Sequence, residues 1–282
     1  IMNLQIVTDS TCDLPPVLIQ QHNITVVPLY INVGDKSYLD QVEITRQAFY
    51  QQLPDFRPHP TTSTPGIATF NQVYEQLAAE GADQILSIHM SEALSATVDA
   101  ARKGAEQTTS VPVTVIDSQQ LSLGTGFAVL TAAEAAQAGK SLDEILALLE
   151  DQIARTYVAA GLDTLEFLRR SGRLNRVATG LGSLLRLKPV LTMHRGQPDS
   201  HNVRTASRAR QWIVDMLKEH QPLERVALVH TNAPETAEIL REMAAPYLPE
   251  GDLLSMDITP VIGAHIGPGA AGFAYITAKR PN

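Results

Sequence analysis

Three short polar segments hold the residues of this chain that could do chemistry. The first is rich in hydroxyls, the second contains a serine and a threonine, and the third sets a histidine beside glycine and proline; they are residues 61–65, 94–97 and 265–270. Hydroxyls and backbone N–H groups at the start of a helix bind an anion better than a metal ion. The segments therefore favour capture of an acidic head group.

The hydroxyls of the first two segments could be helix caps or ligand donors. Thr62 and Ser63 precede Pro65, which we expect at the first position of a helix, and Ser95 precedes a second expected helix. Local sequence alone favours capping. If both helices began at the carboxyl edge of one parallel sheet, their N-termini, each with roughly half a positive charge, could together hold one carboxylate.

The histidine of the third segment has two possible roles. His265 could be an ordinary structural histidine, or the turn expected at residues 267–269 could hold its imidazole against a ligand.

The arginines of residues 168–173 also have two possible roles. They could neutralise the end of a helix, or one of them, Arg173 above all, could face a pocket mouth or a partner protein.

Charge is distributed unevenly along the chain. The formal net charge of −8 argues against general nucleic-acid binding. Residues 169–210 nevertheless contain ten Lys and Arg and one acid, whereas the remainder contains 12 basic and 29 acidic residues. This basic segment is either a solvated face or a docking surface for an acidic or phosphate-bearing partner, with Arg170, Arg173 and Arg176 as candidates.

Several common catalytic motifs fail on inspection. A P-loop ending at residues 139–141 would need glycine where Glu134 stands, and a dinucleotide fingerprint starting at Gly124 would need a small residue at Val129. No G-x-S-x-G elbow is present, and the eight histidines show no H-x-x-x-H spacing. Cys12 is the only cysteine, so it can form no disulfide within the chain. The sequence therefore predicts no metal and no cofactor on this chain.

Alternating strand-like and helix-like runs predict an α/β protein. Strands are expected at residues 4–8, 24–33, 85–90 and 111–116, and the pattern restarts as a strand at 157–162. Residues 141–144 have the form of a capping box that opens a helix, and a glycine-containing helix is expected over residues 177–187. We therefore predict two α/β domains. Residues 1–157 form a parallel sheet with flanking helices, and residues 158–282 form a mixed sheet. The absence of a leader-like N-terminus and of any apolar run of about 18 residues predicts a cytoplasmic protein without a membrane span.

Seven motifs in order resemble the DegV family of bacterial fatty-acid-binding proteins. They are residues 8–10, 62–65, 94–97, 117–118, 168–173, 188–191 and 265–270. Each motif is weak alone, and their order over nearly the whole chain is specific. Two motifs depart from the family pattern: Ala96 stands where glycine is usual, and Thr64-Pro65-Gly66 replaces the family's Gln-Pro-Ser.

The resemblance implies a long-chain fatty acid in a tunnel. Its carboxylate would be bound by Thr62 and Ser95 with His265 nearby, and Ser63, Ala96, Thr97 and Gly267 would lie in the vicinity of the head group. Proteins of this family present the carboxylate to a separate fatty acid kinase subunit. That subunit carries ATP and Mg²⁺ and makes an acyl phosphate for phospholipid synthesis. On this interpretation the chain by itself is a lipid-binding subunit and not an enzyme.

Two other functions stay open at this point. The chain could be a stand-alone enzyme that acts on a small hydroxyketone or a phosphorylated metabolite through His265, which would require a compact polar pocket. It could also be a regulatory protein that uses the basic segment to bind a partner.

Overall fold

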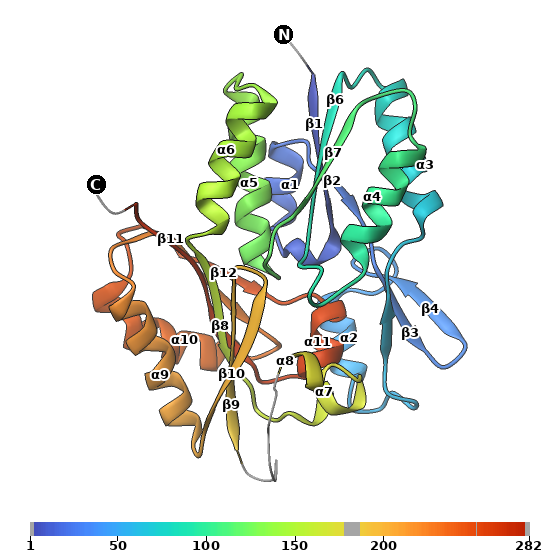
Figure 1. Ribbon diagram of the computed structural model, residues 1–282. Helices are drawn as coiled ribbons and strands as arrows, with labels where there is room; N and C mark the ends of the chain where they lie inside the picture. Colours follow the sequence, from blue (N-terminus) through green and yellow to red (C-terminus); the bar gives the residue numbers. More distant parts are fainter. Residues whose placement is uncertain (1–2, 178–186, 252, 280–282) are drawn as a thin grey trace.

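The computed structural model describes residues 3–177, 187–251 and 253–279. Within these ranges the chain folds as an α/β protein with three sheets (Figure 1). The fold class that the sequence predicts is thereby confirmed. No helix in the described part of the chain combines the length and the apolar character needed to cross a membrane.

A four-stranded parallel sheet forms the N-terminal half. Its strand order is β2-β1-β6-β7, with β1 (Leu4–Asp9), β2 (Thr25–Val27), β6 (Gln84–His89) and β7 (Val113–Asp117). All three strand pairs are parallel, so the loops that follow β1, β6 and β7 meet at one edge. Helices α3 (Ile67–Ala79) and α4 (Thr97–Gln107) cover one face, and α1 (Pro16–Gln21), α5 (Leu123–Gln137) and α6 (Leu142–Ile153) cover the other (Figure 1).

Helix α5 is buried nearly all round because it packs between two sheets. It contacts β1 and β6 on one side and β8 (Thr156–Gly161) and β13 (Ala271–Thr277) on the other. Its alanines and glycines allow this close approach. A Cβ atom at Gly126 would lie 2.4 Å from the carbonyl oxygen of Cys12, so no larger residue fits there. Helix α6 begins at Ser141 with a capping box, as the sequence predicts.

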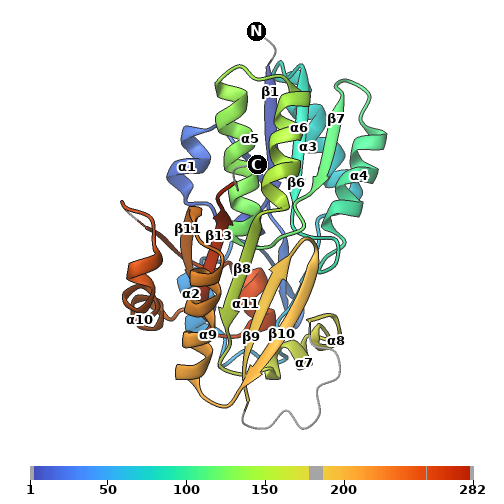
Figure 2. The same cartoon turned by 60° about the vertical axis from the view of Figure 1, so that its left-hand side comes forward.

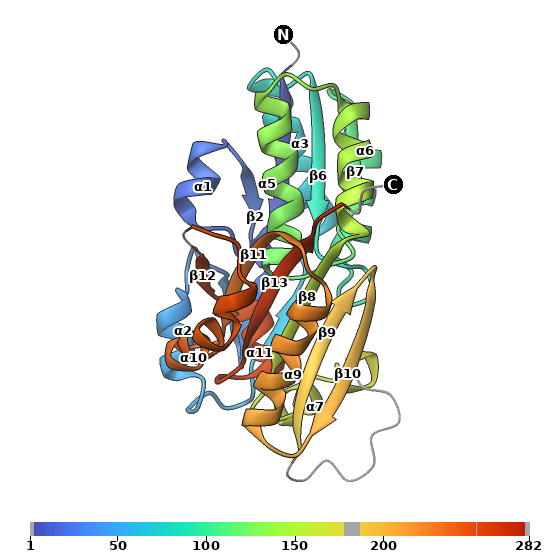
Figure 3. The ribbon, with the colours of Figure 1, turned by 90° about the vertical axis from the view of Figure 1, so that its left-hand side faces the viewer.

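A six-stranded mixed sheet forms the second half. The order is β10-β9-β8-β13-β11-β12, with β9 (Lys188–His194), β10 (Gln197–Val203), β11 (Leu223–His230) and β12 (Leu254–Asp257). Only β11 and β12 pair in parallel. Helices α9 (Ala206–Glu219) and α10 (Pro234–Ala244) cover its outer face (Figure 3). Strand alternation places Ala159 in that outer core and Val158 and Ala160 in the inner core beside α5.

A small third sheet joins the two halves. Its order is β4-β3-β5, all antiparallel, with β3 (Tyr30–Val33), β4 (Lys36–Leu39) and β5 (Thr61–Ser63). Helix α11 (Pro260–Ile266), from the second half, packs against β3, β5, α2 (Arg46–Gln52) and α7 (Glu166–Arg170). The single strand expected over residues 24–33 is divided between β2 of the parallel sheet and β3 of this one. No strand is predicted at β4 or β5, which have only four and three residues.

The remaining described elements are short. They are the 3₁₀ helices η1 (Ser10–Cys12) and η2 (Ala245–Tyr247) and the helix α8 (Leu174–Val177), which lies with α7 beside the β9–β10 hairpin (Figure 2). The helix predicted over residues 177–187 lies almost wholly outside the described residues. The division into domains at residues 157 and 158 stays a prediction.

Candidate ligand-binding site

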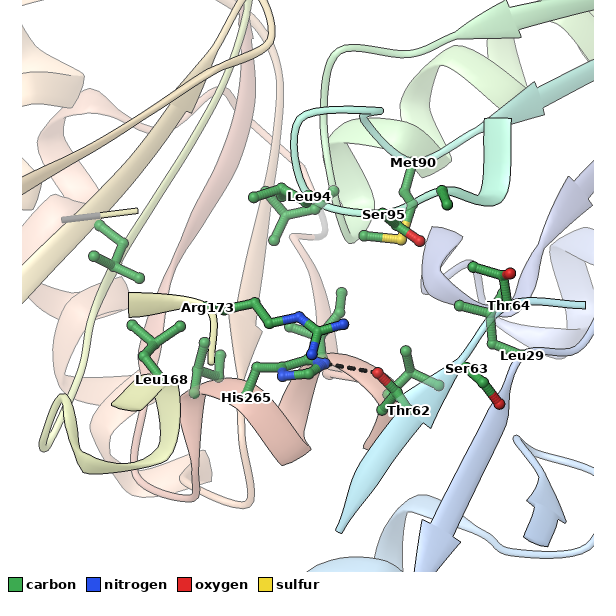
Figure 4. Close-up of a pocket in the computed structure, with 16 residues that line it drawn as sticks. Leu29, Thr62, Ser63, Thr64, Met90, Leu94, Ser95, Leu168, Arg173 and His265 are labelled. Atoms are coloured by element: carbon green, nitrogen blue, oxygen red, sulfur yellow. Dashed lines mark hydrogen bonds between the residues drawn. The ribbon is translucent and has the colours of Figure 1, made fainter. Parts of the chain in front are cut away.

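A cavity of about 240 Å³ lies where the three sheets meet (Figure 4). The loop after β6, strand β5, the turn after α7, strand β9 and helix α11 contribute to its wall. Its lining residues are Leu29, Thr62, Ser63, Thr64, Met90, Leu94, Ser95, Ala96, Leu121, Leu168, Arg173, Leu191, Val261, Ile262, His265 and Ile266. The structure therefore brings the three polar segments of the sequence, more than 200 residues apart at the extremes, to one place.

The hydroxyl segment lies in a strand and not at a helix start. Residues 61–63 form β5, in which Thr62 pairs with Ile31, and helix α3 begins only at Ile67 after Gly66. The prediction of a helix starting at Pro65 is therefore wrong. Because side chains alternate along a strand, the Ser63 hydroxyl turns away and accepts a hydrogen bond from Asn32 Nδ2 at 3.2 Å. Thr62 faces His265 (Figure 4).

His265 lies in the last turn of α11. The loop turn expected at residues 267–269 follows directly after the end of this helix. Gly267 ends the helix with a φ of 75°, a conformation that favours glycine. A Cβ atom there would also lie 2.3 Å from the Phe167 ring. Gly267 thus ends α11 closely against α7, which fixes the helix end that carries the imidazole. It is not among the residues that line the cavity.

The imidazole of His265 is uncharged at neutral pH. Burial, the Arg173 guanidinium and His59 lower its pKa to about 3. Its Nε2 lies 2.8 Å from Thr62 Oγ1, and its buried Nδ1 has no hydrogen-bond partner among the described residues. In the tautomer with the proton on Nε2, the ring donates to Thr62, whose own hydroxyl proton then remains for a ligand.

Ser95 lies across the cavity from Thr62, in the loop that leads from β6 into α4 (Figure 4). Helix α4 begins at Thr97, close to the predicted start. Ser95 Oγ accepts a hydrogen bond from the Thr97 N–H at 3.3 Å and lies 2.8 Å from the buried Thr97 hydroxyl. Ser95 therefore bonds the first N–H group of α4 and also lines the cavity, although the N-cap residue itself is Ala96. No residue of α3 lines the cavity, so the expectation that the N-termini of these two helices converge on the site is wrong.

Arg173 is the only Lys, Arg, Asp or Glu among the described residues that line this cavity. Its side chain is half-buried and its Nη1 donates to the Ser171 carbonyl at 2.8 Å. Its positive charge beside two hydroxyls favours an anionic ligand group. Arg170 does not line the cavity, because Glu166 holds it at the surface through a 2.7 Å contact. The side chain of Arg176 lies outside the described residues.

A second, apolar cavity of about 60 Å³ adjoins the first. The two share a wall of five aliphatic residues: Leu94, Leu121, Leu191, Ile262 and Ile266. The second is lined further by Ser122, Val158, Ala160, Leu162, Thr192, Met193, Pro198, Val229 and Ile258. Together the cavities form a site that is polar at one end and aliphatic at the other. No sequence pattern predicts the aliphatic lining residues, because they cannot be distinguished from ordinary core residues.

The sequence and the fold of this chain are similar to those of known proteins. A family model described as uncharacterised proteins of the DegV family matches residues 3–278. A DegV domain-containing protein of Streptomyces coelicolor is 37% identical over 275 residues, which cover 96% of this chain and 97% of that protein. The chain therefore belongs to the DegV family.

Solved structures of the same fold are similar over their whole length. A DegV family protein from Thermus thermophilus, described by its fatty-acid binding, is 37% identical with a TM-score of 0.89, covering 98% of this chain and 100% of that one. DegV of Bacillus subtilis, described as a fatty acid binding protein, is 30% identical with a TM-score of 0.89, covering 99% and 100%.

Proposed function

We propose that this chain binds a long-chain fatty acid, with the carboxylate at Thr62, Ser95 and His265 and the acyl chain along the aliphatic walls. The observation that carries the proposal is the polarity of the joined cavities. Hydroxyls and a guanidinium line one end, and Ser122 and Thr192 are the only polar residues among the described ones that line the other. The fatty-acid binding of the similar proteins from Thermus thermophilus and Bacillus subtilis supports it.

Affinity in this proposal comes mainly from the acyl chain. Burial of about sixteen carbons at about 0.8 kcal/mol per methylene gains on the order of 10 kcal/mol before the cost of association is subtracted. The head-group residues then supply orientation. A compact polar substrate would leave the shared aliphatic wall without a partner, so the lining favours a lipid over a small hydroxyketone or phosphorylated metabolite.

We further propose that the bound carboxylate is presented to a separate kinase subunit that carries ATP and Mg²⁺. A carboxylate oxygen would attack the γ-phosphorus, the bond to the leaving ADP would break, and an acyl phosphate for phospholipid synthesis would form. Phosphoryl transfer depends chiefly on positioning and charge neutralisation. Arg173, half-buried at the site, is suited to the second role, and the basic segment of residues 169–210 is the candidate docking surface.

The first test is mass spectrometry of small molecules extracted from the purified, denatured protein. We expect a long-chain fatty acid close to one per chain. An empty extract, followed by no binding of added palmitate or oleate in calorimetry, would reject the lipid-carrier function. This result would favour the alternative function, a stand-alone enzyme.

The kinase proposal needs its own test, with the cognate kinase subunit and radiolabelled ATP. Arg173→Ala and His265→Ala should each slow acyl-phosphate formation at fatty-acid concentrations that saturate the variant. Arg241→Ala is the matched control, because this exposed arginine lies outside the basic segment and does not line the cavity. Unchanged turnover in Arg173→Ala and His265→Ala would remove both residues from the transfer step.

A further inference from the structure

A buried ionic cluster lies behind helix α11. Asp13, in the loop after β1, and Asp40, after β4, are each 1% exposed. Arg46, the first residue of α2, donates from Nη2 to Asp13 Oδ1 at 3.1 Å and from Nη1 to Gln41 Oε1 at 2.9 Å. Gln41 Nε2 in turn donates to Asp40 Oδ1 at 2.9 Å. One arginine thus organises two carboxylates, the second through a side-chain amide.

The two carboxylates hold the start of α11. The Thr259 N–H donates to Asp13 Oδ1 at 2.8 Å, and the Thr259 hydroxyl donates to Asp40 Oδ2. Tyr50 Oη donates to the Ile258 carbonyl at 2.9 Å, one residue earlier. Carboxylates beside the N–H groups at a helix start satisfy donors that have no partner within the helix. The start of α11 is therefore fixed by three side chains of the N-terminal half.

Helix α11 transmits this position to the head-group end of the cavity. It has only seven residues, and His265 lies in its last turn. Its middle is fixed as well, because a Cβ atom at Gly263 would lie 2.3 Å from Tyr50 Oη. Because α11 is short and closely packed, it behaves as a rigid unit. A shift at Thr259 therefore displaces the His265 ring from Thr62.

Asp13 also reaches the apolar cavity. Its Oδ2 accepts a hydrogen bond from Ser122 Oγ at 2.6 Å, and Ser122 lines that cavity. Burying ionised groups costs free energy that apolar residues of equal volume would not, so such clusters are weak evidence for stability. A single carboxylate that bonds both Ser122 and the start of α11 is well suited to setting geometry.

We propose that Asp13, held by Arg46, is a positioning residue for His265: it fixes α11 so that the imidazole meets Thr62 across the cavity from Ser95. The binding test of this inference rests on the proposed function, because His265 is taken to contact the carboxylate. The second test measures the protonation of the His265 ring in the ligand-free protein and does not depend on that function.

The binding experiment is a double-mutant cycle on palmitate affinity, with Asp13→Asn and His265→Ala. Asparagine tolerates the left-handed φ of 54° at position 13, so the backbone is not strained. We expect Asp13→Asn to raise the Kd about tenfold in the wild-type background and less than about twofold in the His265→Ala background. An equal increase in both backgrounds would mean that Asp13 does not act through His265.

The second readout is ¹⁵N NMR of the histidine rings without ligand, in which the His265 signal is identified by its absence from His265→Ala. In the wild type this ring should stay neutral across about pH 5 to 8, and in Asp13→Asn it should titrate within that range as its packing loosens. Asp9→Asn is the matched control. Asp9 is equally buried, but it bonds His89 and the Met90 N–H and not α11, so it should leave the His265 signal unchanged.

The outcomes separate the two proposals. If wild-type protein binds no palmitate, the proposed function fails, and the NMR titration alone decides the positioning role. If binding holds but the Asp13→Asn ring behaves as in the wild type, the positioning role is overturned. Should Asp13→Asn not fold, Arg46→Lys replaces it, since lysine keeps the positive charge but cannot bond Asp13 and Gln41 together, so it loosens the hold on Asp13. The same two outcomes apply to it.

Discussion

The two adjoining cavities differ in what their walls offer a ligand. The first is lined by four hydroxyl-bearing residues, an imidazole and a guanidinium beside its apolar residues, whereas the second is lined by aliphatic side chains apart from Ser122, Thr192, Met193 and Pro198. Hydrogen-bonding groups orient a ligand, but each contributes little net binding free energy. Burial of apolar surface contributes binding free energy without fixing an orientation. The comparison assigns orientation to the polar end of the first cavity and most of the affinity to the aliphatic walls of both cavities.

Removing the hydroxyl groups of the head-group end should have the largest effect on palmitate binding. We expect Thr62→Ala combined with Ser95→Ala to weaken palmitate binding by about 3 kcal/mol or more, because each hydroxyl donates to a charged group. Calorimetry with palmitate and with hexadecanol, which has no carboxylate, separates the contributions. Hexadecanol affinity should change much less. Wild-type palmitate affinity in the double variant would reject the head-group assignment.

Filling the apolar cavity should come next. Ala160→Leu adds three carbons to its wall, displacing about three methylenes of the ligand and weakening palmitate binding by about 2 kcal/mol. A short fatty acid such as octanoate should bind as before. Ala159→Leu is the matched control, since the neighbouring side chain faces the outer core. It should cost stability by overpacking and leave the chain-length preference intact. An equal loss for both acids in Ala160→Leu would contradict the assignment.

A substitution at the end of α11 should have a smaller effect, which is measured as a change in the free energy of unfolding. Gly267→Ala should lower the free energy of unfolding by roughly 1 to 2 kcal/mol more than Gly172→Ala. Both glycines have positive φ, 75° and 71°, but a Cβ atom meets the Phe167 ring at position 267 and nothing within 4 Å at position 172. Urea denaturation of the two variants measures the difference. Equal losses would show that Phe167 gives way easily and does not hold the helix end.

The last prediction concerns pH and two buried aspartates, Asp9 at the end of β1 and Asp13 in the loop that follows it. Burial raises the pKa of Asp13 to about 6 despite Arg46, whereas the pKa of Asp9 is lowered because hydrogen bonds from His89 and Thr11 outweigh its burial. A raised pKa means that the folded state binds the proton more tightly. The contribution of Asp13 to stability is therefore full below about pH 4 and is lost as pH rises through about 6.

Asp13→Asn removes this titration and is compared with the wild type by urea denaturation from pH 4 to 7. Relative to the variant, the wild type should lose stability as pH rises from about 4 to 6, by no more than about 1.4 kcal/mol per pH unit. Asp9→Asn should show no such loss in this interval, because the folded-state pKa of Asp9 lies below its ordinary value. Parallel curves for wild type and Asp13→Asn would mean that Asp13 stays ionised throughout.

Local signals predicted the local features of this fold well. The capping box at Ser141 starts α6, and the alternation of strands and helices yields the parallel and mixed sheets. The prediction at residues 61–65 was wrong because a threonine, a serine and a proline together resemble a helix start, while the partner strand β3 is about thirty residues earlier. Nothing within that segment indicates pairing with β3.

The sequence by itself determined the fold class, the family resemblance and the polar segments. Each of these depends on residue types within a few positions of one another or on their order along the chain. Only the tertiary structure brought Thr62 to 2.8 Å from His265, and only it joined the aliphatic residues into a cavity wall. Contacts over about 200 residues depend on how three sheets pack around one short helix. That packing is set by the shapes of many side chains together, which no local pattern records.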